Sequence, residues 1–142
     1  TSEVNQTSLV ILLEVGSEKF LFTGDAGKDA LRDAFKYYED ELGGNVKDFT
    51  VIQLPHHGSR KNINPELLER LAPNSFIISC PPDGVKEGHP SRRLINKILE
   101  MNPNHKIYVT QEHNFVFHKG VEIKASHQKP QEINKKMDGK PN

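Results

Sequence analysis

The chain has 142 residues, of which 27% are charged and 35% hydrophobic, and its 19 basic residues balance its 19 acidic residues. This length predicts one domain, and the balanced charge excludes a surface that attracts DNA, RNA or an anionic membrane through its overall field. Any polyanion must therefore be bound locally. The longest apolar run, Leu9 to Leu13, is far too short to span a bilayer.

The N-terminus and the single cysteine indicate how far the natural chain extends and in which redox environment it folds. The chain begins at Thr1 without a methionine or the apolar stretch of a signal peptide, so we expect that the natural protein extends further upstream. Cys80 is the one cysteine, which excludes a disulfide within the chain and a cysteine-rich zinc site. A buried, unreactive thiol in a reducing bacterial cytoplasm is the expectation that fits this cysteine usage.

The first part of the chain predicts a β-hairpin followed by a helix. Segments 8–14 and 19–23 are rich in β-forming residues and flank a glycine-containing turn. Because these apolar runs are continuous, both faces of their sheet are expected to be covered. Apolar side chains at helical spacing predict a helix over 27–42, which Gly43 and Gly44 end.

The rest of the chain predicts strands that alternate with helices. Proline at the first helical position is typical of helix starts, and short apolar runs are typical of buried strands. Residues 126–142 are polar and without periodicity, which predicts a solvated tail. The expected strands cover 49–54, 75–80, 106–110, 114–118 and 121–124, and the expected helices cover 64–71 and 90–101.

This order of elements predicts an α/β fold. The sheet is expected to be mixed, because its first two strands form a hairpin while later strands are joined by helices. Helices on one face leave the apolar hairpin in need of a layer on the other face, and few elements remain to supply it. We therefore expect the chain to form half of a larger structure.

Three segments place polar side chains directly after a predicted strand: 23–26, 54–59 and 87–91. Ligands of α/β sheets gather beyond the carboxyl ends of the strands, where helix N-termini also point. If the three segments share one edge of the sheet, they form a binding site there.

Asp25 follows a strand and a glycine, so its carboxylate could bind one or two cations. The alternative is that Asp25 caps the helix that follows, a role that Asp29 could also fill. A phosphate-binding P-loop is excluded, because Phe22 replaces its first glycine and Asp29 replaces the Ser or Thr that binds magnesium.

Histidines dominate the other two segments. Neighbouring side chains of an extended backbone point to opposite faces, so only one of His56 and His57 is expected to face a site shared with Asp25. A ligand role and a packing role remain open for this pair. His89 could orient an anion or donate a proton, or it could bind nearby backbone. We expect the remaining histidines to be surface residues: His105, His113, His118 and His127.

Four ordered segments resemble a known family: 5–13, 20–25, 54–59 and 88–91. Together they resemble the C-terminal half of a metallo-β-lactamase-fold hydrolase, and within that family the hydrolase domain of ComEC-like DNA-uptake channels. The resemblance implies an αββα sandwich made of two halves with a metal pair at the edge between the sheets. Residues 1–125 would then be the second half of such a domain, and the half that precedes it would be missing.

The resemblance also implies roles for individual residues. Asp25 matches the carboxylate that bridges two divalent ions, zinc or manganese, and His57 matches a late histidine ligand, with His56 as second choice. Where many members have a further histidine, this chain has Asn5 or Ser8. The family's main ligand motif, His-x-His-x-Asp-His or His-x-Asp-x-Asp-His, is absent from the sequence. Since a catalytic zinc has three protein ligands and a water, we expect the isolated chain to be inactive.

Three functions remain open. The first is a metal-dependent hydrolase of phosphodiesters, nucleic acid among them, completed by the missing N-terminal half in the same or a separate chain. Asp25, His57 and His89 would be catalytic, and Asn5, Ser8, Ser59 and Arg60 would bind substrate, with Lys61 adding positive charge. The second is a non-catalytic interaction or regulatory module that pairs through its exposed sheet face, for example as a homodimer. The third is an ester or lactam hydrolase on the same framework.

Overall fold

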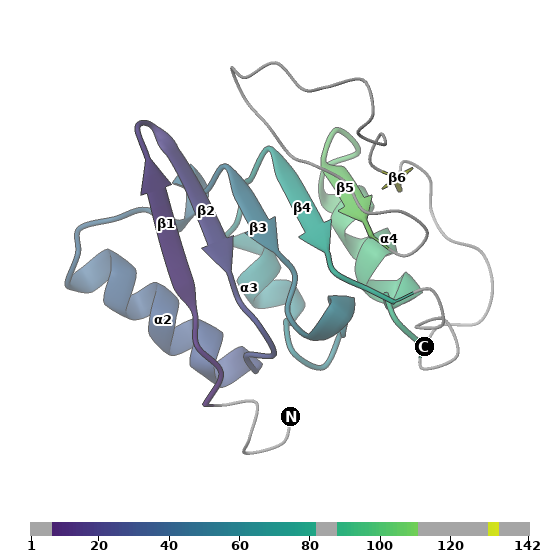
Figure 1. The fold of residues 1–142 in the computed structure, drawn as a ribbon, viewed down its shortest axis with the longest axis horizontal. Coiled ribbons are helices and arrows are strands. Elements are labelled where there is room, and N and C mark those ends of the chain that lie inside the picture. Colours follow the sequence, from purple (N-terminus) through teal and green to yellow (C-terminus); the bar gives the residue numbers. More distant parts are fainter. Residues whose placement is uncertain (1–6, 82–87, 111–130, 134–142) are drawn as a thin grey trace.

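A six-stranded mixed sheet forms the centre of the fold, with its strands in the order β1-β2-β3-β4-β5-β6 (Figure 1). The computed structural model describes residues 7–81, 88–110 and 131–133. The expected α/β class and mixed sheet are confirmed. The strands expected over 114–118 and 121–124, and the candidate residue Asn5, lie outside the described residues.

Strand order in the sheet follows strand order in the chain. β1 and β2 form an antiparallel hairpin, β2 to β5 are parallel, and β6 is antiparallel to β5. Each parallel connection contains one α-helix. The elements are β1 (Ile11–Val15), β2 (Glu18–Phe22), α2 (Lys28–Asp40), the short 3-10 turn η1 (Val46–Asp48), β3 (Val51–Gln53), the 3-10 turn η2 (His56–Gly58), α3 (Pro65–Glu69), β4 (Ser75–Ile78), α4 (Arg92–Met101), β5 (Lys106–Val109) and β6 (Gln131–Glu132).

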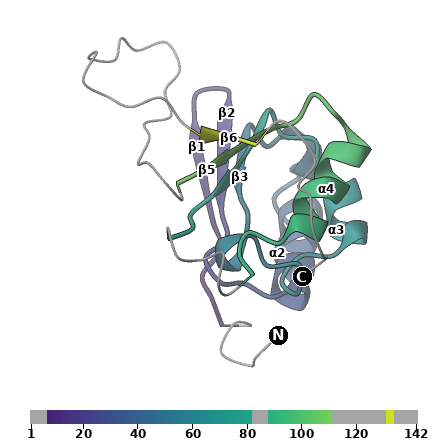
Figure 2. The ribbon, with the colours of Figure 1, turned by 90° about the vertical axis from the view of Figure 1, so that its right-hand side faces the viewer.

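The three α-helices cover the same face of the sheet, and the core lies between them and the strands (Figure 2). Phe35 of α2, Leu68 of α3 and Ile95 of α4 are almost completely buried there, together with Phe76 and Ile107 of the sheet. Burying each of these side chains stabilises the fold by about 1.5–3 kcal/mol. In the described segments, no helix is both long enough and apolar enough to cross a membrane.

The opposite face of the hairpin is apolar and exposed. Val10 and Leu12 pack toward the core, whereas Ile11 and Leu13 are each 47% exposed and Val15 is 58% exposed. Alternate side chains of a strand point to opposite faces, so the same run supplies both sets. The expectation that both faces are covered is therefore wrong for the part of the chain that the structure describes.

Side-chain caps set the starts of α3 and α4. Asn64 Oδ1 accepts a hydrogen bond of 3.0 Å from Leu67 N, so α3 begins at Pro65 as expected. Ser91 Oγ accepts one of 3.4 Å from Leu94 N, so α4 begins at Arg92 and not at Pro90. The N-cap residue, with its short polar side chain, determines where the helical turn begins.

The expected solvated tail differs from the structure at residues 131–133. Gln131–Glu132 form β6 on the edge of β5, and Ile133 N donates a hydrogen bond of 2.7 Å to Ile107 O. An edge strand offers unpaired backbone groups, which a polar segment can satisfy as well as an apolar one.

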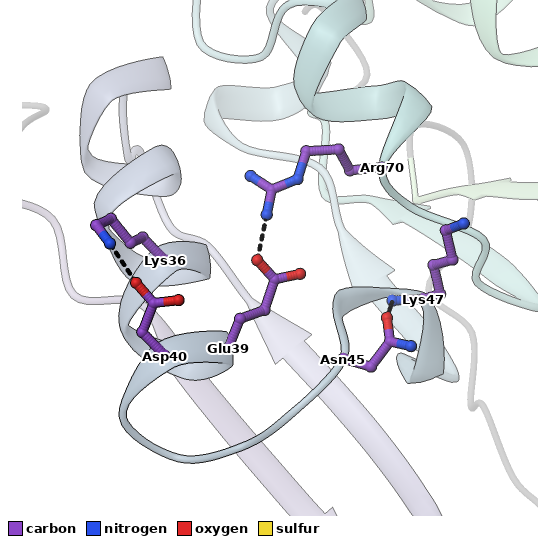
Figure 3. Close-up of polar contacts among 6 residues, drawn as sticks. All are labelled: Lys36, Glu39, Asp40, Asn45, Lys47 and Arg70. Atoms are coloured by element: carbon purple, nitrogen blue, oxygen red, sulfur yellow. Dashed lines mark hydrogen bonds and ion pairs between the residues drawn. The ribbon is translucent and has the colours of Figure 1, made fainter.

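Figure 3 shows three polar contacts in and around α2. Arg70, just after α3, forms an ion pair with Glu39, and Lys36 forms one with Asp40 within α2. Asn45 Oδ1 accepts a hydrogen bond of 3.0 Å from Lys47 N and so caps η1. The Lys36–Asp40 pair is exposed, and such a pair contributes less than about 1 kcal/mol, whereas the Arg70–Glu39 pair is partly buried.

His105 is partly buried, whereas the sequence predicts a surface residue. Its ring meets that of Phe76 edge-on, with the ring centroids 5.3 Å apart. Burial lowers the pKa of His105 from its ordinary value of 6.5 and outweighs a backbone hydrogen bond at Pro73 that acts in the opposite direction.

Acid is expected to destabilise the protein partly through His105. Above pH 6.5 this side chain is neutral in both the folded and the unfolded protein. As the pH falls below 6.5, the imidazole is protonated in the unfolded chain before it is protonated in the folded protein. The free energy of unfolding therefore decreases until the pH passes the lowered pKa of the folded state. Between about pH 7.5 and pH 5.5, urea unfolding should show a larger loss of stability for the natural chain than for a His105→Phe variant. Equal losses would contradict this role.

Candidate functional site

The loops that follow β2, β3 and β4 meet at one edge of the sheet, the lower edge in Figure 1. Thr23 Oγ1 donates a hydrogen bond of 2.6 Å to Gln53 O, and His56 N donates one of 2.9 Å to Gly24 O. Ser91 N donates one of 3.0 Å to Gly58 O. These bonds join the three polar segments that the sequence places after strands.

Asn62 fastens the Asp25 turn to the histidine turn from a position that is only 2% exposed. Its Nδ2 donates to Asp25 O at 3.0 Å and to Ala26 O at 3.3 Å, which turns its Oδ1 toward His56 Nδ1 at 3.3 Å. Because an amide oxygen can only accept, His56 Nδ1 is the donor. No local pattern marks Asn62 as important, because the carbonyl it binds at Asp25 lies 37 residues away in the chain.

Asp25 lies exposed at this edge. The N-cap of α2 is Gly27, and no side chain caps that helix, so the alternative role of Asp25 as a helix cap is wrong. Ser8 lies beside the same turn, since a Cβ atom placed on Gly24 would be 3.9 Å from Ser8 Oγ. A carboxylate and a hydroxyl therefore flank the turn that follows β2.

His56 and His57 both adopt left-handed backbone conformations, with φ of 48° and 56°. This conformation costs a non-glycine residue about 1–2 kcal/mol, and such strain tends to occur at functional sites. The expectation that the two rings point to opposite faces is wrong, because it assumes an extended backbone. Their ring centroids lie 5.9 Å apart.

A backbone hydrogen bond orients the ring of His57. Its Nδ1 lies 2.6 Å from Ser79 O, in the loop after β4. A carbonyl oxygen can only accept, so Nδ1 carries the hydrogen and Nε2 of the neutral ring holds a lone pair. Metal-binding histidines commonly have their second nitrogen held in this way. His57 is also the more exposed of the two neighbours.

His89 brings a third imidazole to the same place. Its ring centroid lies 5.5 Å from that of His56 and 6.2 Å from that of His57. The rings come from the loops after β3 and β4, which Ser91 N and Gly58 O connect. Groups that are more than thirty positions apart in the sequence are thus neighbours at the sheet edge.

The two remaining candidates for substrate binding, Ser59 and Arg60, lie in different surroundings. Ser59 is 5% exposed, and its Oγ accepts a hydrogen bond of 3.3 Å from Lys61 N, so the hydroxyl supports its own turn. Arg60 is exposed and lines a groove between α3 and α4. Lys61 is exposed beside it.

Two side chains at this edge are of types that can bind metal ions. Asp25 and His57 supply a carboxylate oxygen and an oriented imidazole nitrogen, which are ligands that zinc and manganese accept. Within residues 7–81, 88–110 and 131–133, however, no group of three or more His, Cys, Asp or Glu side chains is placed to hold a metal ion.

Comparison with known proteins finds that the chain is similar to part of a bacterial protein. It is 29% identical over 105 residues to "ComE operon protein 3" of Bacillus subtilis (strain 168). The match covers 74% of this chain and 12% of that relative, so the chain spans a small part of the relative's length. No family model matches the sequence, and no solved structure matches it.

Proposed function

We propose that this chain is the second half of a metal-dependent hydrolase that acts on phosphodiesters. The observation that carries the proposal is the meeting of the Asp25 turn, His57 and His89 at one edge of the sheet, with three loop-to-loop hydrogen bonds holding their loops together. The chain matches only 12% of ComE operon protein 3, which is much longer. This similarity supports the proposal that a further part of the polypeptide supplies the other half of the domain.

In this proposal each side chain at the edge has a separate task. Asp25 would help to hold the divalent cations, zinc or manganese, and His57 would hold one of them through Nε2, in the orientation that the hydrogen bond to Ser79 O gives its ring. His56 is the alternative ligand. The cations would lower the pKa of water and so supply a nucleophile at neutral pH. His89 binds a phosphate oxygen or protonates the leaving oxygen.

The missing ligands would come from a half that covers the exposed sheet face. Ile11, Leu13 and Val15 offer that half a row of apolar side chains, and Phe22 adds an aromatic ring that is 42% exposed. A second sheet packs at about 10 Å from the first, which brings its own edge loops next to Asp25 and His57.

A non-catalytic module is the second candidate function, because the same apolar face could serve to bind a partner, including a second copy of the chain. It differs from the hydrolase in what the complete protein binds. The hydrolase requires about two transition metal ions for each complete polypeptide. The module requires none.

The test is metal analysis and phosphodiester hydrolysis by the complete polypeptide. Replacing Asp25 by Asn should remove bound metal and lower the hydrolysis rate by about a hundredfold or more, because even residues that only support metal ligands cost up to that much. Asp29→Asn is the matched control, since Asp29 is exposed on α2 and pairs with Arg32. It should leave both measurements unchanged.

Three outcomes would contradict the proposal. A complete protein that binds no transition metal at micromolar supply would favour the module. Hydrolysis confined to esters or lactams would show that the substrate class is wrong. Turnover by the 142-residue chain alone, lost in an Asp25→Ala variant, would show that no second half is needed.

A further inference from the structure

A basic groove of about 790 Å³ lies between α3 and α4, on the helix-covered side of the molecule. Its volume is within the range of ligand-binding clefts. Pro65 and Leu68 of α3 form part of its wall. The charged side chains that line it are four cations and one carboxylate: Arg60, Arg92, Arg93, Lys97 and Glu100. In a chain with no net charge, this groove is a local concentration of positive charge.

The basic end of the groove adjoins the histidine edge. Arg60 follows His57 by three residues, and Arg92 follows His89 by three residues. The hydrogen bond from Ser91 N to Gly58 O holds these two loops together. Glu100 lies at the opposite end of α4, so positive charge increases toward the candidate catalytic residues.

The arrangement along α4 suits a polymer better than a single phosphate. The groove follows α4 from Arg92 to Glu100, about 12 Å along the helix axis, and Arg93 and Lys97 are one turn apart on it. A single nucleic-acid strand carries one phosphate for each nucleotide, so more than one phosphate of a strand fits this length. The first turn of α4 contains no acidic residue, which leaves the positive end of the helix dipole uncompensated by its own sequence.

Three of the groove's four cations are accessible to such a ligand. Arg60 and Arg93 are exposed. Lys97 forms an ion pair of 3.5 Å with Glu69, and both partners are at least one-third exposed, so solvent weakens the pair. Guanidinium groups bind phosphate oxygens with two parallel hydrogen bonds, which makes the arginines the stronger anchors.

We propose that this groove binds the phosphate backbone of a nucleic-acid strand and leads it to the histidine edge. The inference rests on the proposed function and narrows its substrate from any phosphodiester to a polynucleotide. The groove itself contacts the backbone, so it binds strands of different sequence alike.

The test uses the 142-residue chain and a fluorescein-labelled single-stranded oligothymidylate in fluorescence anisotropy titrations at several salt concentrations. An Arg60→Gln/Arg93→Gln variant should bind about tenfold more weakly at low salt. The slope of log affinity against log salt should become shallower by about 0.7 for each phosphate that the variant no longer neutralises. Arg32→Gln/Lys36→Gln is the matched control, because it removes the same charge from exposed ion pairs on α2. Circular dichroism verifies that both variants are folded.

The outcomes separate this inference from the proposed function. Three results would contradict the role of the groove in binding a strand. They are an equally large drop in affinity in the control variant, no binding by the natural chain, and binding of duplex DNA without binding of the single strand. An Asp25→Asn variant that still binds the oligonucleotide supports the groove even if the complete protein lacks hydrolase activity. Conversely, the complete protein could show metal-dependent hydrolysis while the Arg60→Gln/Arg93→Gln variant binds the oligonucleotide as well as the natural chain. That result would contradict the role of the groove and leave the proposed function standing.

Discussion

Replacing Gly58 by alanine is expected to lower the free energy of unfolding by about 2–3 kcal/mol and to displace the histidine loops. Gly58 is buried with φ of 79°, a conformation that alanine adopts only at a cost. A Cβ atom there would lie 3.0 Å from Pro90 Cβ and 3.4 Å from Ile78 Cγ2. Both the backbone and the packing therefore oppose any side chain at this position.

The functional consequence follows from what Gly58 connects. Its carbonyl accepts the hydrogen bond from Ser91 N, so a shift of Gly58 moves the loop of His57 relative to that of His89. Histidine side-chain NMR signals should change in the Gly58→Ala variant along with the urea midpoint. Gly16→Ala is the control, because Gly16 also has a positive φ but a Cβ atom there meets nothing within 4 Å. It should cost about 1 kcal/mol, and an equal cost at both positions would contradict the packing argument.

Replacing Gly44 by alanine is expected to cost about 3 kcal/mol, for a purely steric reason. A Cβ atom on Gly44 would lie 2.1–2.4 Å from ring atoms of Tyr38, which is closer than atoms can approach. The ring cannot easily move away. It stacks on Phe49 with the centroids 5.4 Å apart, and its hydroxyl binds Lys19 Nζ at 2.8 Å.

Gly43 provides the matched control for Gly44. It has φ of 67° and open space where a Cβ atom would stand, so Gly43→Ala should cost only the backbone term of about 1 kcal/mol. Urea unfolding of the two single variants measures the difference directly. If Gly43→Ala proves the more destabilising change, the Tyr38 contact does not limit this position.

Local signals predict the elements of this fold well. The hairpin, α2 and the Asn64-Pro65 start of α3 agree with the structure, because turn glycines, helical spacing and capping residues act over a few positions. The same reasoning places α4 two residues early, since proline at 90 is a signal as strong as the Ser91 cap that sets the start of the helix.

The arrangement of the candidate site depends on contacts that no local pattern contains. The Asp25 and His57 segments are recognisable as polar residues after strands, yet the left-handed turn that gathers the histidine rings follows from packing around Gly58. The groove is similar. Arg93 and Lys97 are visibly one turn apart, but only the packing of α4 beside α3 shows that they line a groove with Arg60.

The row of residue pairs across the sheet has a consequence for folding during synthesis of the chain. Leu21 pairs with Ile52, Ile52 with Phe76, and Phe76 with Ile107, so each strand from β3 to β5 aligns on the strand synthesised just before it. Closing one strand–helix–strand unit at a time avoids the entropy cost of joining distant segments. The growing chain can therefore add its strands one at a time during translation, with the hairpin as the template for β3 and each later strand as the template for the next.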